Sequence, residues 1–232
     1  MEEIFNELKA LASEEKKEVL SYFFKTGKGQ YGEDDKFLGV TVPNIRLVSK
    51  KHIDLDFKTI REILHSPYHE MRMCALLILV GKMTKAKKDT ALQKEIFDFY
   101  LSQTKYINNW DLVDLSAPKI VGQYLLDKPR DILYTLADSP LLWDNRIAIV
   151  STHTLIRNND FEDTYNLAVK MMHHPHDLIH KAIGWMLRET EKHNYENLFK
   201  FIEKYRHEMP RTMLRYAIEH FPAEQRKYLM GK

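Results

Sequence analysis

Cysteine is almost missing from this sequence, which has a single one, Cys74, among 232 residues. No disulfide framework can therefore hold the chain together. Cys74 lies inside the longest apolar run, residues 74–80, so we expect a small buried hydrophobe and neither a disulfide partner nor a nucleophile. That run is also far too short to span a bilayer. Because the first residues, MEEIFNEL, are acidic and not basic, we expect a cytoplasmic protein with no membrane partner.

The sequence also lacks a stretch rich in glycine, proline and serine that would mark a linker, and it has little net charge. It holds only 8 glycines and 8 prolines, and no stretch concentrates them with serine, so we predict a single domain over residues 1–232. The formal net charge is +2 and the pI is near 8.4, too close to balance to indicate nucleic-acid binding. The distribution of the positive charge must decide that question.

Strand signals do not occur, whereas helix signals recur along the whole chain. No alternating apolar run is bounded by Asn-Gly or Gly-Gly pairs. Capping residues or prolines precede apolar residues at helical spacing instead. We predict helix starts at Ser13, Thr41 with Pro43, Asp56, Ser66 with Pro67, just before Ala91, at Asn108 or Asn109, Ser116 with Pro118, Ser139 with Pro140, Asp160, His174 with Pro175, Asn194, and Met209 with Pro210. The predicted fold class is therefore all-α.

The spacing of these prolines indicates a repeat. Pro140, Pro175 and Pro210 follow one another at intervals of 35 residues, and Pro67 lies 73 residues before Pro140, close to two such intervals. An interval of this size is the length of one helical hairpin. We therefore predict a right-handed α-solenoid of HEAT-like helix pairs, in which an inner row of helices lines a concave surface.

A basic residue recurs at a similar distance after each of these prolines: Arg72, Arg146, Lys181 and Arg215. On the inner row of helices, these residues would form a positive stripe along the concave face. Such a stripe is the footprint of a protein that binds a phosphate backbone. The alternative is that they are solvated charges at the ends of apolar helix faces.

The segment YINNWDLVDLSAPKIVG combines a large ring with carboxylates at the start of a helix. With Asn108 or Asn109 as the N-cap, Trp110 opens the helix, and a spacing of four residues places Asp114 on the same face as Trp110. Asp111 is turned about 100° away from that face. A ring and a carboxylate on one rigid element suggest a functional site. The alternative is that Trp110 packs on a neighbouring helix while the acids favour the helix dipole.

Four longer segments carry a family resemblance: KFLGVTVPNIR (36–46), INNWDLVD (107–114), WDNRIAIVST (143–152) and KAIGWMLRE (181–189). They are similar to the HEAT-like repeat alkylpurine DNA glycosylases, the AlkD family, and the likeness covers nearly the whole chain. In that family the site is lined by a tryptophan and an aspartate four residues apart, an arginine on the next inner helix, and a second tryptophan on the one after. The resemblance therefore implies catalytic roles for Trp110, Asp114, Arg146 and Trp185.

A tyrosine at the end of the first helical region also borders the lesion in this family. Tyr22 is the best match, and Tyr31 competes because TGKGQYGEDD (26–35) looks like an insertion relative to the family. The residues expected to bind DNA are Tyr22, Thr41, Arg46, Arg72, Lys181, Arg188, Arg211 and Arg215.

The resemblance implies a DNA alkylation repair glycosylase that hydrolyses the N-glycosidic bond of cationic N3- or N7-alkylated purines in duplex DNA, without classical base flipping. A positively charged purine leaves the sugar without a general acid. One carboxylate can therefore both stabilise the developing oxocarbenium ion and place a water. Two tryptophan faces would hold the cationic sugar and base by cation–π contact.

We expect a monomer whose partner is duplex DNA containing alkylated bases, with no cofactor and no metal. His176 and His180 have the i, i+4 spacing of zinc ligands, but neither a glutamate of the HExxH type nor a set of cysteines accompanies them. Two alternatives stay open. The chain could be a catalytically silent HEAT-repeat protein that binds DNA structures, or a HEAT scaffold that binds other proteins.

Overall fold

The structure, a computed structural model, describes residues 1–231, which contain helices and no β-strand. A single isolated bridge joins Lys36 to Tyr68 within this part of the chain. The prediction of an all-α helical-repeat fold is confirmed. The handedness of the repeat and a concave basic face stay predictions. No helix among the described residues combines the length and the apolar character needed to cross a membrane.

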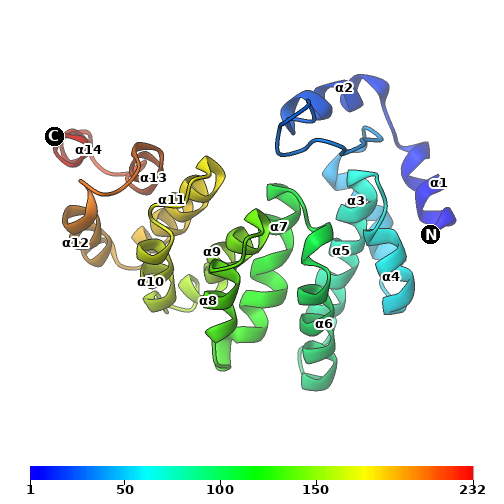
Figure 1. Cartoon of the computed structure of the whole chain (residues 1–232). Coiled ribbons are helices and arrows are strands. Elements are labelled where there is room, and N and C mark those ends of the chain that lie inside the picture. The colour runs from blue at the N-terminus through cyan, green and yellow to red at the C-terminus, as the bar shows by residue number, and fades with distance from the viewer. Residues whose placement is uncertain (232) are drawn as a thin grey trace. The chain divides into compact units, whose positions relative to one another are not determined.

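The chain divides into two compact units, the first Met1–Ile120 and the second beginning at Val121. The single domain expected over residues 1–232 stays a prediction. The helices of the first unit are α1 (Glu2–Ala10), α2 (Glu14–Phe23), α3 (Val42–Lys51), α4 (Phe57–Leu64), α5 (His69–Lys85), α6 (Thr90–Ser102) and α7 (Trp110–Ala117), with a 3-10 turn, η1 (Thr104–Tyr106), before α7 (Figure 1). Those of the second unit are η3 (Leu125–Asp127, 3-10), α8 (Asp131–Ala137), α9 (Leu142–Ile156), α10 (Glu162–Lys170), α11 (Asp177–Glu191), α12 (Tyr195–Tyr205), α13 (Arg211–Ala217) and α14 (Ala223–Met230).

Helix α5 forms the centre of the first unit. It is apolar on nearly every side, and it packs against α1, α3, α4, α6 and α7. Cys74 lies on α5 with none of its surface exposed, and this burial raises the pKa of its thiol to about 12. The expectation of an inert, buried cysteine is therefore confirmed.

Helix α9 has the corresponding place in the second unit. It packs against α8, α10 and α11, and α11 in turn packs against α12 and α13. The helices α9, α11 and α13 begin at Leu142, Asp177 and Arg211, one or two residues after the prolines that define the repeat. The regular spacing of those prolines is therefore the spacing of successive packed helices.

One predicted helix start is wrong. Pro118 does not open a new helix after Ser116, because α7 continues directly into a π-helical turn, Pro118–Gly122. The backbone of Pro118 is itself helical, with φ of −59°. Ser116 is fully buried, and its hydroxyl donates to the Leu112 carbonyl at 2.6 Å and lies 2.9 Å from the Tyr100 hydroxyl. Ser116 therefore ties α7 to α6 and caps no helix.

Gly184 marks the closest approach of α11 to α13. A Cβ at this position would lie 2.5 Å from the Tyr216 Cβ and 2.6 Å from the Met213 carbonyl oxygen. Gly184→Ala should therefore destabilise the protein by about 1–3 kcal/mol, since overpacking outweighs the gain in helix propensity. The free energy of unfolding in urea measures this effect.

Gly81 on α5 provides the matched control, because a Cβ there would meet the flexible end of the Ile53 side chain, which can move away. Gly81→Ala should change the free energy of unfolding by less than about 1 kcal/mol. Equal stability of the two variants would show that α11 and α13 do not approach this closely.

Candidate active site

Helix α7 begins at Trp110 because Asn109 caps it. The Asn109 side-chain oxygen accepts a hydrogen bond from the Trp110 N–H at 2.8 Å, and its amide nitrogen donates to Asp35 at 3.3 Å. The predicted start at one of two neighbouring asparagines is confirmed at Asn109. Trp110 and Asp114 follow one helical turn apart, and both are half-buried.

The Trp110 ring packs on the end of α2. It stacks on Phe24 with ring centroids 5.4 Å apart and meets Phe23 edge-on at 5.9 Å. Phe24 in turn lies against Phe37 at 5.3 Å and against the His69 ring at 5.0 Å. Trp110 therefore does pack on a neighbouring helix, as one alternative held, but it is only half-buried. A column of rings supports it from one side.

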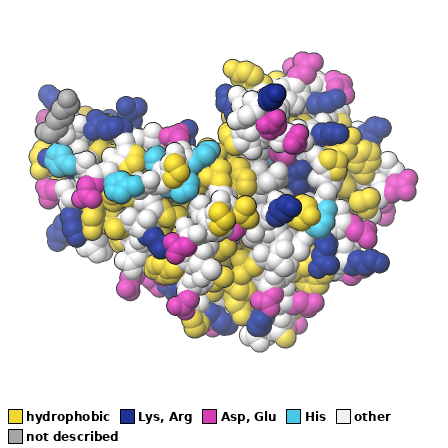
Figure 2. Space-filling view, viewed as in Figure 1, with side chains coloured by type: hydrophobic (Ala, Val, Ile, Leu, Met, Phe, Trp, Pro, Cys, Tyr) yellow, Lys and Arg dark blue, Asp and Glu magenta, His cyan; other side chains and the backbone are white. Residues whose placement is uncertain are grey.

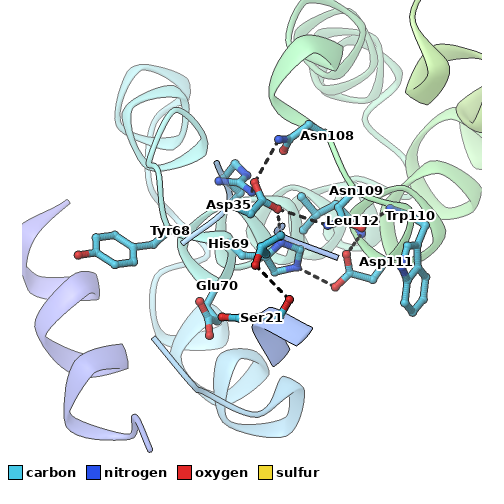
Figure 3. A network of polar contacts seen from close by, with 12 residues as sticks. Ser21, Asp35, Tyr68, His69, Glu70, Asn108, Asn109, Trp110, Asp111 and Leu112 are labelled. Carbon is cyan, nitrogen blue, oxygen red and sulfur yellow. Dashed lines mark hydrogen bonds and ion pairs between the residues drawn. The ribbon is translucent and has the colours of Figure 1, made fainter. Parts of the chain in front are cut away.

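Four charged side chains form a buried network beside this column. Figure 3 shows three of them, Asp35, His69 and Asp111. His69 lies between two carboxylates, with Nε2 2.8 Å from Asp111 Oδ2 and Nδ1 3.3 Å from Asp35 Oδ2. Arg72, one turn further along α5, donates to Asp35 Oδ1 at 2.6 Å. The side chains of His69, Asp35 and Arg72 are 2%, 3% and 5% exposed. Because each ring nitrogen faces an acceptor-only carboxylate, His69 carries a hydrogen on both nitrogens.

The charge of His69 is maintained against its burial. Burial alone would lower the pKa of His69, but the negative charge and hydrogen bond of Asp111, with the hydrogen bond of Asp35, raise it to about 9. Burial would raise the pKa of Asp35. Hydrogen bonding to His69 and the charge of Arg72 outweigh burial, so the pKa of Asp35 lies below its ordinary value. Two positive groups therefore balance two negative groups inside the first unit.

The two acids of α7 have different surroundings. Asp111 is 14% exposed, accepts from His69 through Oδ2, and accepts from the Leu112 N–H through Oδ1 at 2.8 Å. Oδ2 therefore links α7 to α5, while Oδ1 bonds within α7, and both oxygens are occupied. Asp114 lies one turn after Trp110, on the Trp110 side of the helix. No local pattern marks Asp111 for this contact, because its partner His69 is 42 residues away.

The structure places the two candidate tyrosines differently from the rings around Trp110. Tyr22 is 82% exposed, and the Lys25 amino group lies 5.2 Å from its ring centroid. Tyr31 is half-buried in the segment that follows α2. Neither assignment at the lesion is tested by these positions. The rings that contact Trp110 are those of Phe23, the last residue of α2, and Phe24, which follows it.

Among the predicted DNA-binding residues of the first unit, Arg72 lies in the buried network, and its contact with DNA stays a prediction. Its guanidinium donates to Asp35 and to the Ser66 carbonyl at 3.0 Å, and the residue is only 4% exposed. Arg46 on α3 is exposed, and Thr41 at the N-cap of α3 is half-buried. Partial burial and the charge of Arg46 lower the pKa of Lys119, which places two cations near one another.

The second unit holds the remaining predicted residues. Arg146 on α9 is 5% exposed, and its guanidinium donates to the Leu178 carbonyl in the first turn of α11 at 2.7 Å. Trp185 on α11 is half-buried, donates from its indole nitrogen to Glu189 at 3.3 Å, and lies 5.9 Å from the His153 ring.

The four other predicted residues of this unit, all basic, lie on α11 and α13. Lys181 forms an ion pair with Asp177 at 2.7 Å, and Arg188 pairs with Glu219 of the segment after α13. Arg211 and Arg215 are exposed, one turn apart on α13. Exposed positive charge in the second unit therefore includes α13, whereas Arg188 is largely committed to an acid.

Histidine side chains gather over the second unit (Figure 2). At the start of α11, the His174 Nδ1 accepts from the His176 N–H at 3.0 Å, and the His176 Nδ1 accepts from the Leu178 N–H at 3.2 Å as the N-cap. Burial lowers the pKa of both histidines. These rings therefore use their nitrogens to build the turn that begins α11.

Comparison with known proteins agrees with this architecture. The family of DNA alkylation repair enzymes matches residues 4–221. The chain therefore belongs to the DNA alkylation repair enzyme family, and its role lies in the repair of alkylated DNA. The family resemblance seen in the sequence is confirmed.

A solved structure from Enterococcus faecalis, described as a predicted DNA alkylation repair enzyme, is similar to this chain. The TM-score is 0.70 with 15% sequence identity, over 91% of this chain and 97% of that chain. At this identity, the likeness shows the fold alone. No curated protein matches the chain.

The charge on His69 should make stability depend on pH. Its pKa in the folded protein, about 9, lies above the ordinary value of 6.5, so its contribution is fully present below pH 6.5 and is lost as pH rises through about 9. The free energy of unfolding in urea should fall by about 3 kcal/mol across this window. His69→Gln should lower stability at neutral pH and remove most of this slope.

His52→Gln is the control, because His52 pairs with Glu7 at 2.6 Å and lies outside the network. Its slope above pH 6.5 should match that of the wild type. Parallel curves for the wild type and His69→Gln would show that His69 is not charged in the folded protein.

Proposed function

We propose that this chain is a monofunctional DNA glycosylase that hydrolyses the N-glycosidic bond of purines alkylated at N3 or N7 in duplex DNA. Family membership supports a repair enzyme acting on alkylated DNA. The observation that carries the finer assignment is the arrangement on α7. Trp110 and Asp114 are half-buried one turn apart, while the nearby acid Asp111 is committed to His69.

The chemistry needs only one carboxylate. A purine alkylated at N3 or N7 is already positively charged, so it departs with the bonding electrons and needs no proton from an acid. The deoxyribose is left as an oxocarbenium ion. Asp114 would stabilise this ion and orient the water that attacks the anomeric carbon, and the attacking water loses its proton to solvent or to the carboxylate.

The half-exposed Trp110 ring suits the same cationic state. An indole face within about 6 Å of a cation attracts it through the ring quadrupole, more strongly when water is excluded. Phe24 stacks on this ring and Phe23 meets it edge-on, and the exposed part of the ring would meet the sugar or the lesion. Arg146 and Trp185 belong to the second unit, and their assignment to the same site, with hydrolysis without base flipping, stays a prediction.

Replacing the charge of Asp114 tests the chemistry. Asp114→Asn should release N3-methyladenine and N7-methylguanine from methylated duplex DNA slower by about two to three orders of magnitude, because one preorganised electrostatic group is lost. Binding of the methylated duplex should stay equal or become tighter. Single-turnover release and a binding titration measure the two effects.

Asp98→Asn serves as the control for charge alone, since Asp98 is an exposed acid on α6 paired with Lys94. It should release base at the wild-type rate. A wild type that binds duplex DNA but releases no alkylpurine would instead support a catalytically silent DNA-binding protein. If the wild type binds no duplex DNA, the remaining alternative is a scaffold that binds other proteins.

The salt dependence of DNA binding tests the basic residues. Lys181→Ala and Arg215→Ala should each reduce the slope of log affinity against log salt concentration by about one unit, the loss expected for one phosphate contact. Arg72→Ala should lower stability without changing this slope, because its guanidinium is buried.

Lys204→Ala provides the matched control for loss of an exposed positive charge, because Lys204 lies on α12 and outside the row of helices that begin after the repeat prolines. Its slope should equal that of the wild type. If the Lys181 and Arg215 variants also keep the wild-type slope, neither residue contacts the phosphate backbone.

A further inference from the structure

The buried network and the aromatic column meet at His69, which reaches Trp110 by two routes. One route runs through Asp111, which accepts from His69 at 2.8 Å and is the residue next to Trp110 on α7. The other runs through Phe24, whose ring lies 5.0 Å from His69 and stacks on Trp110 at 5.4 Å. The backbone and the ring of Trp110 are therefore both held by groups that contact His69.

The segment between α2 and α3 is fixed at the same place. The backbone N–H of His69 donates to the Lys36 carbonyl at 2.8 Å, and the backbone N–H of Lys36 donates to the Pro67 carbonyl at 3.1 Å. Asp35 therefore enters the network from a segment whose backbone is clamped to the start of α5. Asp35 is also the last residue of the stretch TGKGQYGEDD (26–35).

The neighbouring Glu70 strengthens this clamp from the other side. Its carboxylate accepts the backbone N–H groups of Leu38, Gly39 and Val40 at 2.8–3.2 Å, and the residue is 1% exposed. Consecutive residues of α5 thus hold the segment by its backbone and by Asp35. Because this segment is held firmly, Asp35 can fix the position of His69, and His69 that of α7 through Asp111.

We propose that Asp35, His69 and Asp111 form a positioning triad for Trp110, through which the segment 26–35 becomes part of the machinery that acts on DNA. The triad touches no substrate; it sets where the Trp110 ring and the first turn of α7 stand. This inference rests on the proposed glycosylase function for its effect on rate, but the positioning itself can be measured without it.

The electrostatics give the triad a defined response. The charged groups that face His69 are Asp35 from the segment before α3, Asp111 from α7, and Arg72 and Glu70 from its own helix, while Phe24 and Phe37 cover its ring. The Glu70 carboxylate accepts the backbone N–H groups of residues 38–40. Loss of the His69 proton would leave two carboxylates with Arg72 as their cation, so α7 would be repelled from the clamped segment.

Fluorine NMR of the protein labelled with 5-fluorotryptophan tests the positioning directly. The chain has three tryptophans, and Trp110→Phe assigns the Trp110 signal. In the wild type, this signal should move with a midpoint near pH 9, the pKa of His69, while the signals of Trp143 and Trp185 should not follow that titration. A Trp110 signal that stays fixed between about pH 7.5 and 10.5 would overturn the proposal.

His69→Gln should displace the Trp110 signal at neutral pH and abolish its movement near pH 9. Asp35→Asn, which keeps the His69–Asp111 pair, should displace it less, and it provides the measurement if His69→Gln does not fold. His52→Gln, a change of the same kind at the His52–Glu7 pair, should leave the signal in place. Wild-type spectra for both triad variants would overturn the proposal.

Release of alkylpurine supplies the second readout. His69→Gln should lower the single-turnover rate by roughly 10- to 100-fold, the scale of a small misplacement of a catalytic group, with affinity for methylated duplex within about threefold of wild type. The wild-type rate should fall above pH 9, and the His69→Gln rate should lack that fall. A loss confined to affinity would overturn the effect on rate. If the wild type releases no base, the proposed function fails, whereas the fluorine titration still decides the positioning.

Discussion

The first unit depends on a charged histidine held in its interior. A buried charge is stable only when opposite charges and hydrogen bonds replace the water it has lost. His69 obtains both from Asp35 and Asp111, which belong to different segments of the chain. This requirement fixes the segment before α3, the start of α5 and the start of α7 against one another. It also gives the two acids of α7 different surroundings. Asp111 is bonded to His69, whereas Asp114 lies on the same side of the helix as Trp110.

The second unit uses a similar arrangement at a different place. Arg130, just before α8, lies 2.7 Å from both Asp160 and Asp163 at the start of α10, and the Tyr134 hydroxyl donates to Asp163 at 2.6 Å. In helical repeats, each helix pair contacts mainly its neighbours. A cation shared by two carboxylates is one way to fix the start of one helix against the next, and both units contain one. In the first unit, this arrangement also lies next to Trp110, the ring for which we propose a catalytic role.

Most helix starts could be predicted from the sequence because their signals are local. Ser13, Asp56 and Asn194 accept the backbone N–H of the third residue after them, and such a cap needs only a few neighbouring residues. The prediction missed α1, α8 and α14, whose N-cap residues, Met1, Arg130 and Pro222, make no side-chain capping bond. It also placed a helix start at Pro118, where tertiary packing of Ser116 and a π turn continue α7.

The sequence by itself determined the all-α fold, the repeat interval and the spacing of Trp110 and Asp114, since each follows from helix geometry over a few turns. The tertiary structure alone decided which charges are surface and which are interior. Arg72 had the same spacing as the exposed Arg215, yet its partner Asp35 lies 37 residues away and draws it inside. His69 has partners 34 and 42 residues away, so no local pattern marks it. Burial and pairing depend on which segments meet in the folded chain, and this is why the residues that hold Trp110 in place became visible only there.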